Sequence, residues 1–172
     1  MKDLATKLPY EVSDDHKQRR ALLWKTFDVN GNNLLSLAEV DKGVKMMNLP
    51  ELFALKPVLM RAFTAAVKRS PAKTASDDNF ISPSEFRFLL QYMQQFYELW
   101  LIFDQVDADD DRRISKEEFL KAKHVLAKFG MDTSDMDAQW KSFDQNGGGQ
   151  VLFDEFCEKA IAIGLDHDKK SN

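Results

Sequence analysis

Apolar and polar positions along this chain repeat in the same order three times. Each repeat contains a run of twelve residues that is mostly polar or glycine-rich. Two apolar residues come before the run, one of them four positions and the other one position ahead of its first residue. The eighth position of every run is apolar. The paired residues are Trp24 and Phe27, Phe103 and Val106, and Trp140 and Phe143, and the eighth positions are Leu35, Ile114 and Val151. This repeat predicts helix–loop–helix units with loops at residues 28–39, 107–118 and 144–155.

The helices of the N-terminal half are bounded by capping and breaking residues. Residues 14–27 form the first predicted helix, with Ser13 as its N-cap and two aspartates in its first turn. A second helix follows the first loop and ends at about Asn48. A third segment covers residues 50–67, and Pro57 predicts a break or kink within it.

The C-terminal half is predicted from similar signals. Nothing interrupts the helical pattern of residues 83–106, which predicts one long helix between the second and third loops. Gly130 is expected to end the helix after the third loop, and Gly164 to end the last helix. Thr133 or Ser134 is expected to cap the helix between them. The aromatic residues of the long helix are interpreted as core packing rather than a cofactor pocket; they are Phe86, Phe88, Phe96, Tyr97, Trp100 and Phe103.

The strongest chemical signal is loop three, residues 107–118, which reads D-A-D-D-D-R-R-I-S-K-E-E. Hard cations such as Ca²⁺ take about six to eight oxygen ligands. An EF-hand loop supplies them at positions 1, 3, 5, 7, 9 and 12, with a backbone carbonyl at 7 and a bidentate Glu at 12. The candidate ligands are Asp107, Asp109, Asp111, the Arg113 carbonyl, Ser115 and Glu118. The alternative interpretation is a solvated acidic turn.

The other loops match the same template less completely. Loop one offers Asp28, Asn30, Asn32, the Leu34 carbonyl, Ser36 and Glu39. Loop four offers Asp144, Asn146, the Gln150 carbonyl and Glu155, while Gly148 at position 5 and Leu152 at position 9 have no side-chain oxygen, so that waters would complete the set. Residues 74–85 form a second loop in the same register, with Ile81 at position 8 and Glu85 at position 12, but Thr74 replaces the leading Asp.

Ligand charge and the residue at position 6, where the loop turns sharply, rank the four loops. Loop three has four carboxylate ligands and should bind best, although Arg112 occupies the position that favours Gly. In loop one, Asn33 tolerates the turn and two charged ligands predict weak to moderate binding. Loop four has Gly149 at the turn but an incomplete ligand set. Loop two is expected to stay empty and to support loop one.

Together these patterns predict an all-α fold of four EF-hand units in two pairs, with short two-stranded β-bridges between paired loops. A single unit cannot bury its apolar face without a partner. The predicted divisions are a mobile segment at residues 1–12, pairs at residues 13–93 and 94–165, and a polar tail at residues 166–172.

Charge and cysteine content limit the possible partners and the cellular location of the protein. Residues 1–90 carry 14 Lys and Arg against 11 Asp and Glu, a net +3, whereas residues 91–172 carry 10 against 17, a net −7. The acidic half suits cation binding and argues against nucleic acid as a partner. The single Cys157 cannot form an internal disulfide, which favours a reducing, cytoplasmic location. No membrane span is expected.

Several stretches resemble one known family: E-F-R-F-L-L-Q-Y-M-Q-Q-F-Y-E-L-W, F-D-Q-V-D-A, E-E-F and F-D-Q-N-G-G-G-Q-V-L-F-D-E-F, together with K-Q-R-R-A-L-L-W-K-T-F-D-V-N-G-N-N-L-L. They are similar to the calflagins, the flagellar calcium-binding proteins of trypanosomes. The resemblance implies that loops three and four bind Ca²⁺ while loops one and two are structural, which reverses the ranking of loops one and four. It also implies a flagellar location. Calflagins carry an N-terminal Gly and a nearby Cys for acylation; this chain begins Met1, Lys2, Asp3, so we expect no lipidation here.

We expect a Ca²⁺ sensor that exposes an apolar surface to a protein partner. Two alternatives remain: a Ca²⁺ buffer, and a constitutive adaptor whose sites have decayed. Catalysis is not expected, because His16, His124 and His167 fall in no recognisable catalytic arrangement.

Overall fold

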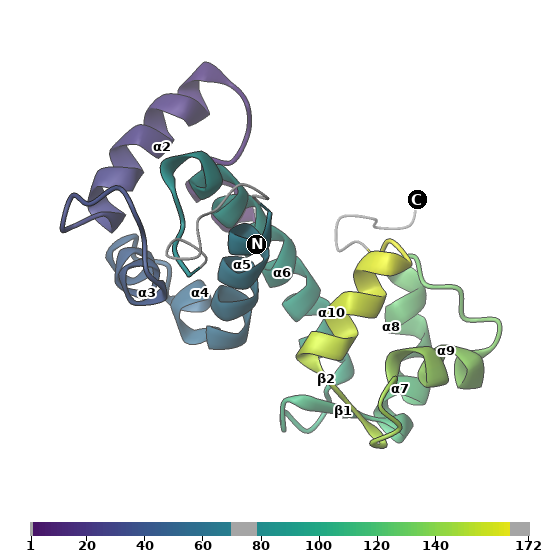
Figure 1. The fold of residues 1–172 in the computed structure, drawn as a ribbon. Coiled ribbons are helices and arrows are strands. Elements are labelled where there is room, and N and C mark those ends of the chain that lie inside the picture. The colour runs from purple at the N-terminus through teal and green to yellow at the C-terminus, as the bar shows by residue number, and fades with distance from the viewer. Residues whose placement is uncertain (1, 70–78, 166–172) are drawn as a thin grey trace. The chain divides into compact units, whose positions relative to one another are not determined.

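The computed structural model describes residues 2–69 and 79–165, and the chain divides into two compact units, Met1–Phe96 and Tyr97–Asn172 (Figure 1). The first unit contains α1 (Lys2–Lys7), α2 (Asp14–Phe27), α3 (Leu37–Met46), α4 (Pro50–Ala54), α5 (Lys56–Lys68) and the start of α6 (Pro83–Val106). The second contains the end of α6, β1 (Arg113–Ser115), α7 (Lys116–Lys121), α8 (Lys123–Lys128), α9 (Met136–Phe143), β2 (Gln150–Leu152) and α10 (Phe153–Ala162). The predicted all-α fold with a small antiparallel sheet is confirmed.

Helices α2 and α3 flank loop one and approach each other at a glycine. Ser13 caps α2 as predicted, since its Oγ accepts a hydrogen bond from the His16 N–H at 3.3 Å. A Cβ on Gly43 of α3 would lie 2.5–2.6 Å from ring carbons of the fully buried Phe27. Only a glycine at this position lets α3 come so close, which fixes the two helices of the first hand against each other.

Loops one and two pair through their eighth positions, as the repeat predicts. Leu35 and Ile81 form an antiparallel bridge. The Leu35 N–H donates to the Ile81 carbonyl at 2.8 Å, and the Ile81 N–H donates back at 2.9 Å. Both side chains are fully buried. The two N-terminal hands are therefore joined as one pair.

The break predicted at Pro57 occurs two residues earlier. Helix α4 ends at Ala54 and α5 begins at Lys56, with Leu55 between them. Pro57 itself lies in the first turn of α5, where its missing N–H removes no intrahelical hydrogen bond. The position of the predicted break was wrong because a proline suits a helix start as well as it breaks a helix interior.

The N-terminal segment, which we expected to be mobile, contains α1. Leu4 is 6% exposed and Leu8 is fully buried. Two carbonyls further along this segment, those of Pro9 and Glu11, accept hydrogen bonds from Arg20 of α2 at 2.8 and 2.6 Å. The structure thus places apolar contacts and hydrogen bonds where the sequence signals no element.

The second unit is built around the two-stranded sheet that joins loops three and four. Strands β1 and β2 are antiparallel, with Ile114 opposite Val151. Both of these side chains are fully buried. Beside them, Arg113 Nη1 donates to Gln150 Oε1 at 2.8 Å across the sheet. This confirms that the C-terminal loops form a pair.

Two boundaries of the second unit differ from the prediction. The helix after loop three is interrupted at Ala122, whose ψ of 8° separates α7 from α8. This interruption could not be predicted from the sequence, because Ala has the highest helix propensity. The next helix, α9, is capped by Asp135 rather than by Thr133 or Ser134, since the Asp135 side chain accepts from the Ala138 N–H at 2.9 Å. An aspartate caps as well as a hydroxyl residue does.

The long helix α6 forms as predicted and carries much of the core. Of its aromatic residues, Phe86, Phe96, Trp100 and Phe103 are buried, while Phe88 and Tyr97 are half-buried. In the second unit, the Trp100 ring lies 4.9 Å from that of Phe153. Within the described ranges, no helix is both long enough and apolar enough to cross a membrane.

Candidate metal centres

Loop three begins where α6 ends, and its first carboxylate is held from within the loop. Asp107 is only 7% exposed. Its Oδ2 accepts a hydrogen bond from the Arg112 N–H at 2.8 Å, and its Oδ1 accepts from the Asp111 N–H at 3.3 Å. These contacts direct the side chain into the loop, which is the orientation that a ligand at position 1 requires.

The last carboxylate of loop three folds back onto the start of the loop. Glu118 Oε2 accepts from the N–H and Oγ of Ser115 at 2.9 and 2.7 Å, and Oε1 accepts from the Ala108 N–H at 2.9 Å. Ser115 Oγ in turn accepts from the Glu118 N–H, which completes a capping box. Glu118 therefore starts α7 and closes the loop at the same time.

Three predicted ligands of loop three meet in space. Asp107, Asp109 and Glu118 each offer a carboxylate oxygen, and these oxygens all lie within 4.8 Å of one another. Asp111 is not one of these three residues; its Oδ1 accepts from the Arg113 N–H at 2.8 Å. A set of oxygens with this much negative charge fits a hard divalent cation.

The electrostatics of loop three agree with a cation site. Burial raises the pKa of the Asp107 carboxyl, and the charges of Asp111 and Glu118 raise it further, against the opposing effect of backbone N–H donors. Burial also raises the pKa of Glu118, but hydrogen bonds from Ser115 and from backbone N–H groups outweigh it, so that this pKa lies below its ordinary value. Carboxylates gathered in this way repel one another until a cation balances them.

Position 6 is left-handed in each of the three fully described loops, as predicted. The φ angles are 67° at Arg112, 61° at Asn33 and 76° at Gly149. In each of these three loops the turn aims the N–H of position 6 at the first carboxylate. The N–H to Oδ2 distances are 2.8 Å to Asp107, 3.0 Å to Asp28 and 3.1 Å to Asp144.

Loop four keeps its first and last carboxylates. Asp144 Oδ1 is buried and accepts no hydrogen bond from the described part of the chain. A buried carboxylate oxygen without a donor is unfavourable unless a cation compensates it. Glu155 Oε2 accepts from the Leu152 N–H at 3.1 Å. The loop therefore fits a cation at position 1 despite its incomplete ligand set.

Position 5 of loop four is the gap that the sequence predicts. The Gly148 N–H donates to Asn146 Oδ1 at 2.6 Å, and the same oxygen lies 2.6 Å from where a Cβ on Gly148 would stand. Leu152 at position 9 is 48% exposed. Gln150 Oε1 accepts a hydrogen bond from Arg113, so the backbone carbonyl of Gln150 is the atom left to act as the predicted ligand at position 7.

Loop one is fully hydrogen-bonded. Asp28 is 9% exposed and accepts from the N–H groups of Asn32 and Asn33 at 3.1 and 3.0 Å, one on each oxygen. Further hydrogen bonds run from the Leu34 N–H to Asn32 Oδ1 at 2.9 Å, and from the Ser36 N–H and Oγ to Glu39 Oε2 at 3.0 and 2.8 Å.

Only the end of loop two is described. Glu85 is 3% exposed, and its Oε2 accepts from the N–H and Oγ of Ser82 at 2.8 Å each. Thr74, on which the expectation of an empty loop rests, lies outside the described residues, as does Pro71. The absence of an ion in loop two stays a prediction.

Sequence reasoning missed one feature that loops one and four share. The side-chain amide at position 3 donates to Oε1 of the Glu at position 12, at 2.6 Å from Asn30 to Glu39 and at 2.6 Å from Asn146 to Glu155. In loop three the same position is Asp109, which has no such donor. The signal was present, because Asn occupies position 3 in these two loops and not in loop three.

Two family models match the chain. The FCaBP EF-hand domain matches residues 4–93, and an EF-hand domain pair matches residues 96–161. A flagellar calcium-binding protein of Trypanosoma cruzi is 35% identical over 164 residues, which cover 94% of this chain and 78% of that protein. Two flagellar calcium-binding proteins of Trypanosoma brucei brucei, TB-1.7G and TB-17, are 32% and 31% identical over 172 residues, covering 96% of this chain and 75% and 74% of theirs.

These matches extend over both units and agree with the paired loops described above. The sequence similarities also identify Ca²⁺ as the ion for such loops. The chain therefore belongs to the flagellar calcium-binding protein family of EF-hand proteins.

Proposed function

We propose that this protein is a Ca²⁺ sensor whose dominant site is loop three, and that filling this loop exposes apolar surface to a protein partner. The observation that carries the proposal is the cluster of Asp107, Asp109 and Glu118, with carboxylate oxygens within 4.8 Å of one another. This cluster lies one residue from Phe119, a fully buried aromatic residue of the core.

The full ligand set that we propose for loop three adds the Asp111 carboxylate, the Arg113 carbonyl and Ser115. We place loop four second, because the buried Asp144 Oδ1 accepts no hydrogen bond from the residues that the structure describes and so favours a cation there. Its proposed ligands are Asp144, Asn146, Gln150 and Glu155, with water at Gly148. Loop one follows. Like loop four it has only two charged ligands, and both Asp28 oxygens already accept backbone N–H groups, as those of Asp107 do in the more highly charged loop three.

Helix α7 would couple the site to the core. Bound Ca²⁺ supplies a double positive charge at the centre of the loop. Glu118 Oε1 now accepts from the Ala108 N–H and Oε2 from Ser115, so ligation with both oxygens would turn this side chain toward the centre of the loop. Phe119 is the next residue on the same helix turn, and its ring lies 5.5 Å from Trp140 and 5.2 Å from Phe143. Movement of Glu118 therefore shifts Phe119 against these rings.

The interruption at Ala122 supports such a movement. Helix α7 is only six residues long, and α8 begins directly after Ala122. A short helix with a break behind it can rotate without moving the next helix as a rigid body. Two buried aromatic residues are Phe129, at the end of α8, and Phe156, in α10. After such a movement they would line the opened surface, which would suit an amphipathic partner helix.

The test is apolar exposure during a Ca²⁺ titration with Mg²⁺ held constant. The neutral dye Nile red reports apolar surface, and emission from Trp100 and Trp140 is isolated in a Trp24→Phe background. A sensor gives dye binding and an emission change that saturate together with the ion. Ion binding without dye binding supports a buffer instead, and no ion binding supports a constitutive adaptor; either result overturns the proposal.

We extend a flagellar location to this chain from the names of its relatives. An epitope-tagged copy expressed in Trypanosoma brucei should co-localise with a flagellar marker by immunofluorescence. An even distribution through the cell body would contradict this part of the proposal.

A further inference from the structure

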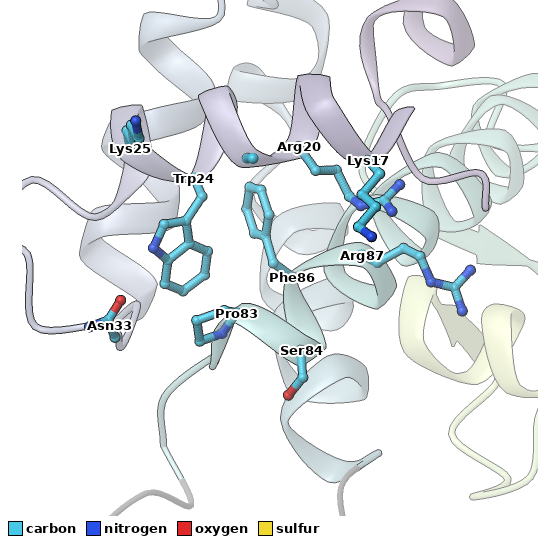
Figure 2. A pocket seen from close by; sticks show the side chains of 10 residues that line it. Lys17, Arg20, Trp24, Lys25, Asn33, Pro83, Ser84, Phe86 and Arg87 are labelled. Carbon is cyan, nitrogen blue, oxygen red and sulfur yellow. The ribbon is translucent and has the colours of Figure 1, made fainter. Parts of the chain in front are cut away.

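The first unit contains a cavity of about 470 Å³. Helix α2 and the first turns of α6 form its walls (Figure 2). This volume is in the range that small-molecule sites occupy. None of the ten described residues that line it is acidic.

The lining is divided into a basic part and an apolar part. Figure 2 shows Lys17, Arg20 and Arg87 gathered at one end, with Trp24, Phe86 and Pro83 beside them. The ring centroids of Trp24 and Phe86 lie 5.2 Å apart in an edge-to-face arrangement. We call this site the basic pocket.

The two guanidinium groups are held in place. Arg20 Nη1 donates to the carbonyls of Pro9 and Glu11, and Arg87 Nη1 donates to the Tyr10 carbonyl at 3.4 Å. A guanidinium has five N–H donors, so these contacts leave others for a ligand. Burial lowers the pKa of Arg20, and the charge of Arg87 lowers it further. Two fixed like charges, with no carboxylate among the described residues that line the pocket, favour an anion.

We propose that the basic pocket binds a small aryl phosphate, with the phosphate between Lys17, Arg20 and Arg87 and the flat ring against Trp24 and Phe86. Three cations suit a dianion, and planar guanidinium groups match phosphate oxygens. The aromatic wall suits a ring rather than a bare ion, because ring pairs gain from edge-to-face or offset contact. This site lies outside the predicted ion ligands.

Occupancy of the basic pocket also reaches the first EF-hand. Asn33 lines the pocket, and its N–H donates to Asp28 Oδ2 at 3.0 Å. A ligand that touches Asn33 therefore contacts the turn of loop one directly. Linkage requires any effect of the ligand on Ca²⁺ affinity to be matched by an equal effect of Ca²⁺ on ligand affinity.

Calorimetry with 1-naphthyl phosphate tests the proposal on the full chain. Binding should be at least tenfold tighter than for inorganic phosphate or for 1-naphthol, since each of these offers only one of the two features. AMP and phenyl phosphate separate the two sources of this chemistry, a nucleotide and a phosphorylated phenol. Equal affinity for 1-naphthyl phosphate and inorganic phosphate, or no binding of either, would overturn the assignment.

Variants locate the site. Lys17→Gln removes an exposed cation from the pocket and should weaken 1-naphthyl phosphate by about three- to tenfold, the range for a charge-assisted contact that is partly solvated. Lys68→Gln makes the same change at an exposed position of α5 that does not line the basic pocket, so the affinity for 1-naphthyl phosphate should be unaltered. Trp24→Leu should weaken the aryl ligand but not inorganic phosphate. Equal losses in the Lys17 and Lys68 variants would place binding elsewhere.

Discussion

Loops three and four share one β-sheet, yet each has what the other lacks. Loop three gathers three carboxylates within 4.8 Å but forces Arg112 into a left-handed turn at φ 67°. Loop four has Gly149 at the same turn, φ 76°, but no side chain at position 5. A non-glycine residue in this region costs about 1–2 kcal/mol.

The comparison teaches that ligand charge and backbone fit are separable in an EF-hand. Backbone fit changes the stability of the loop by a fixed amount, whether or not an ion is present. Ligand charge is unfavourable in the empty loop, where the carboxylates repel one another, and becomes favourable once the cation is bound. Loops span many decades of affinity on this basis. Loop three should therefore bind more tightly than loop four despite its strained turn.

The largest expected effect is loss of the tightest site. Glu118→Gln removes the charge of the position 12 ligand while keeping its shape, and should weaken Ca²⁺ binding to loop three on the order of 100-fold. Calorimetry on the full chain measures it. Glu117→Gln is the matched control: Glu117 is exposed and pairs with Lys121 on the helix surface, so this variant should bind normally. An unchanged tight site in Glu118→Gln would show that another loop dominates.

A carboxylate added to loop four should narrow the difference between the loops. Gly148→Asp supplies the missing position 5 ligand and should tighten this site by about tenfold. The only close approach of the new Cβ is 2.6 Å to Asn146 Oδ1, the end of a flexible side chain that has to shift. Competition against a Ca²⁺ chelator dye measures the second binding step. If that step does not tighten, the missing oxygen is not what limits loop four.

Much of the fold could be predicted from the sequence because it depends on local rules. The apolar position 8 residues identified the partners Leu35 with Ile81 and Ile114 with Val151, and Ser13 identified a helix start. The interruption at Ala122 could not be predicted, since Ala favours helix and tertiary packing decides there.

The candidate sites were partly predictable for the same reason. Spacing along one loop identified Asp107, Asp109 and Glu118, whose oxygens do meet. The basic pocket was not predicted, although Lys17, Arg20 and Trp24 share one face of α2 at helical spacing. Its other wall comes from the start of α6, more than fifty residues later in the chain, and only the tertiary fold brings Arg87 to it.

The contribution of backbone fit to stability can be tested by a substitution at position 6 of loop four. Gly149→Ala places a side chain at φ 76° with no heavy atom within 4 Å of the new Cβ, so strain is confined to the backbone. The free energy of unfolding in the absence of Ca²⁺ should fall by about 1 kcal/mol. Urea denaturation measures it. A neutral or stabilising result would show that the turn tolerates L residues without strain.

The smallest effect is the reverse change in loop three. Arg112→Gly relieves the turn at φ 67° but adds freedom to the unfolded chain. The net gain in the free energy of unfolding should be about 0.5 kcal/mol in Ca²⁺-free urea denaturation. Arg113→Gly, next to it in the extended strand β1, is the control and should destabilise. Destabilisation by both variants would mean that Arg112 contributes more through contacts than it loses through strain.

The order in which the loops fill tests the central claim most directly. The backbone N–H groups of Arg112, Gly149 and Asn33 each donate to the first carboxylate of their own loop, so their NMR resonances report the three loops separately. In a Ca²⁺ titration with Mg²⁺ present, the Arg112 resonance should shift first, that of Gly149 second and that of Asn33 last. A titration in which Gly149 or Asn33 shifts before Arg112 would contradict the dominance of loop three.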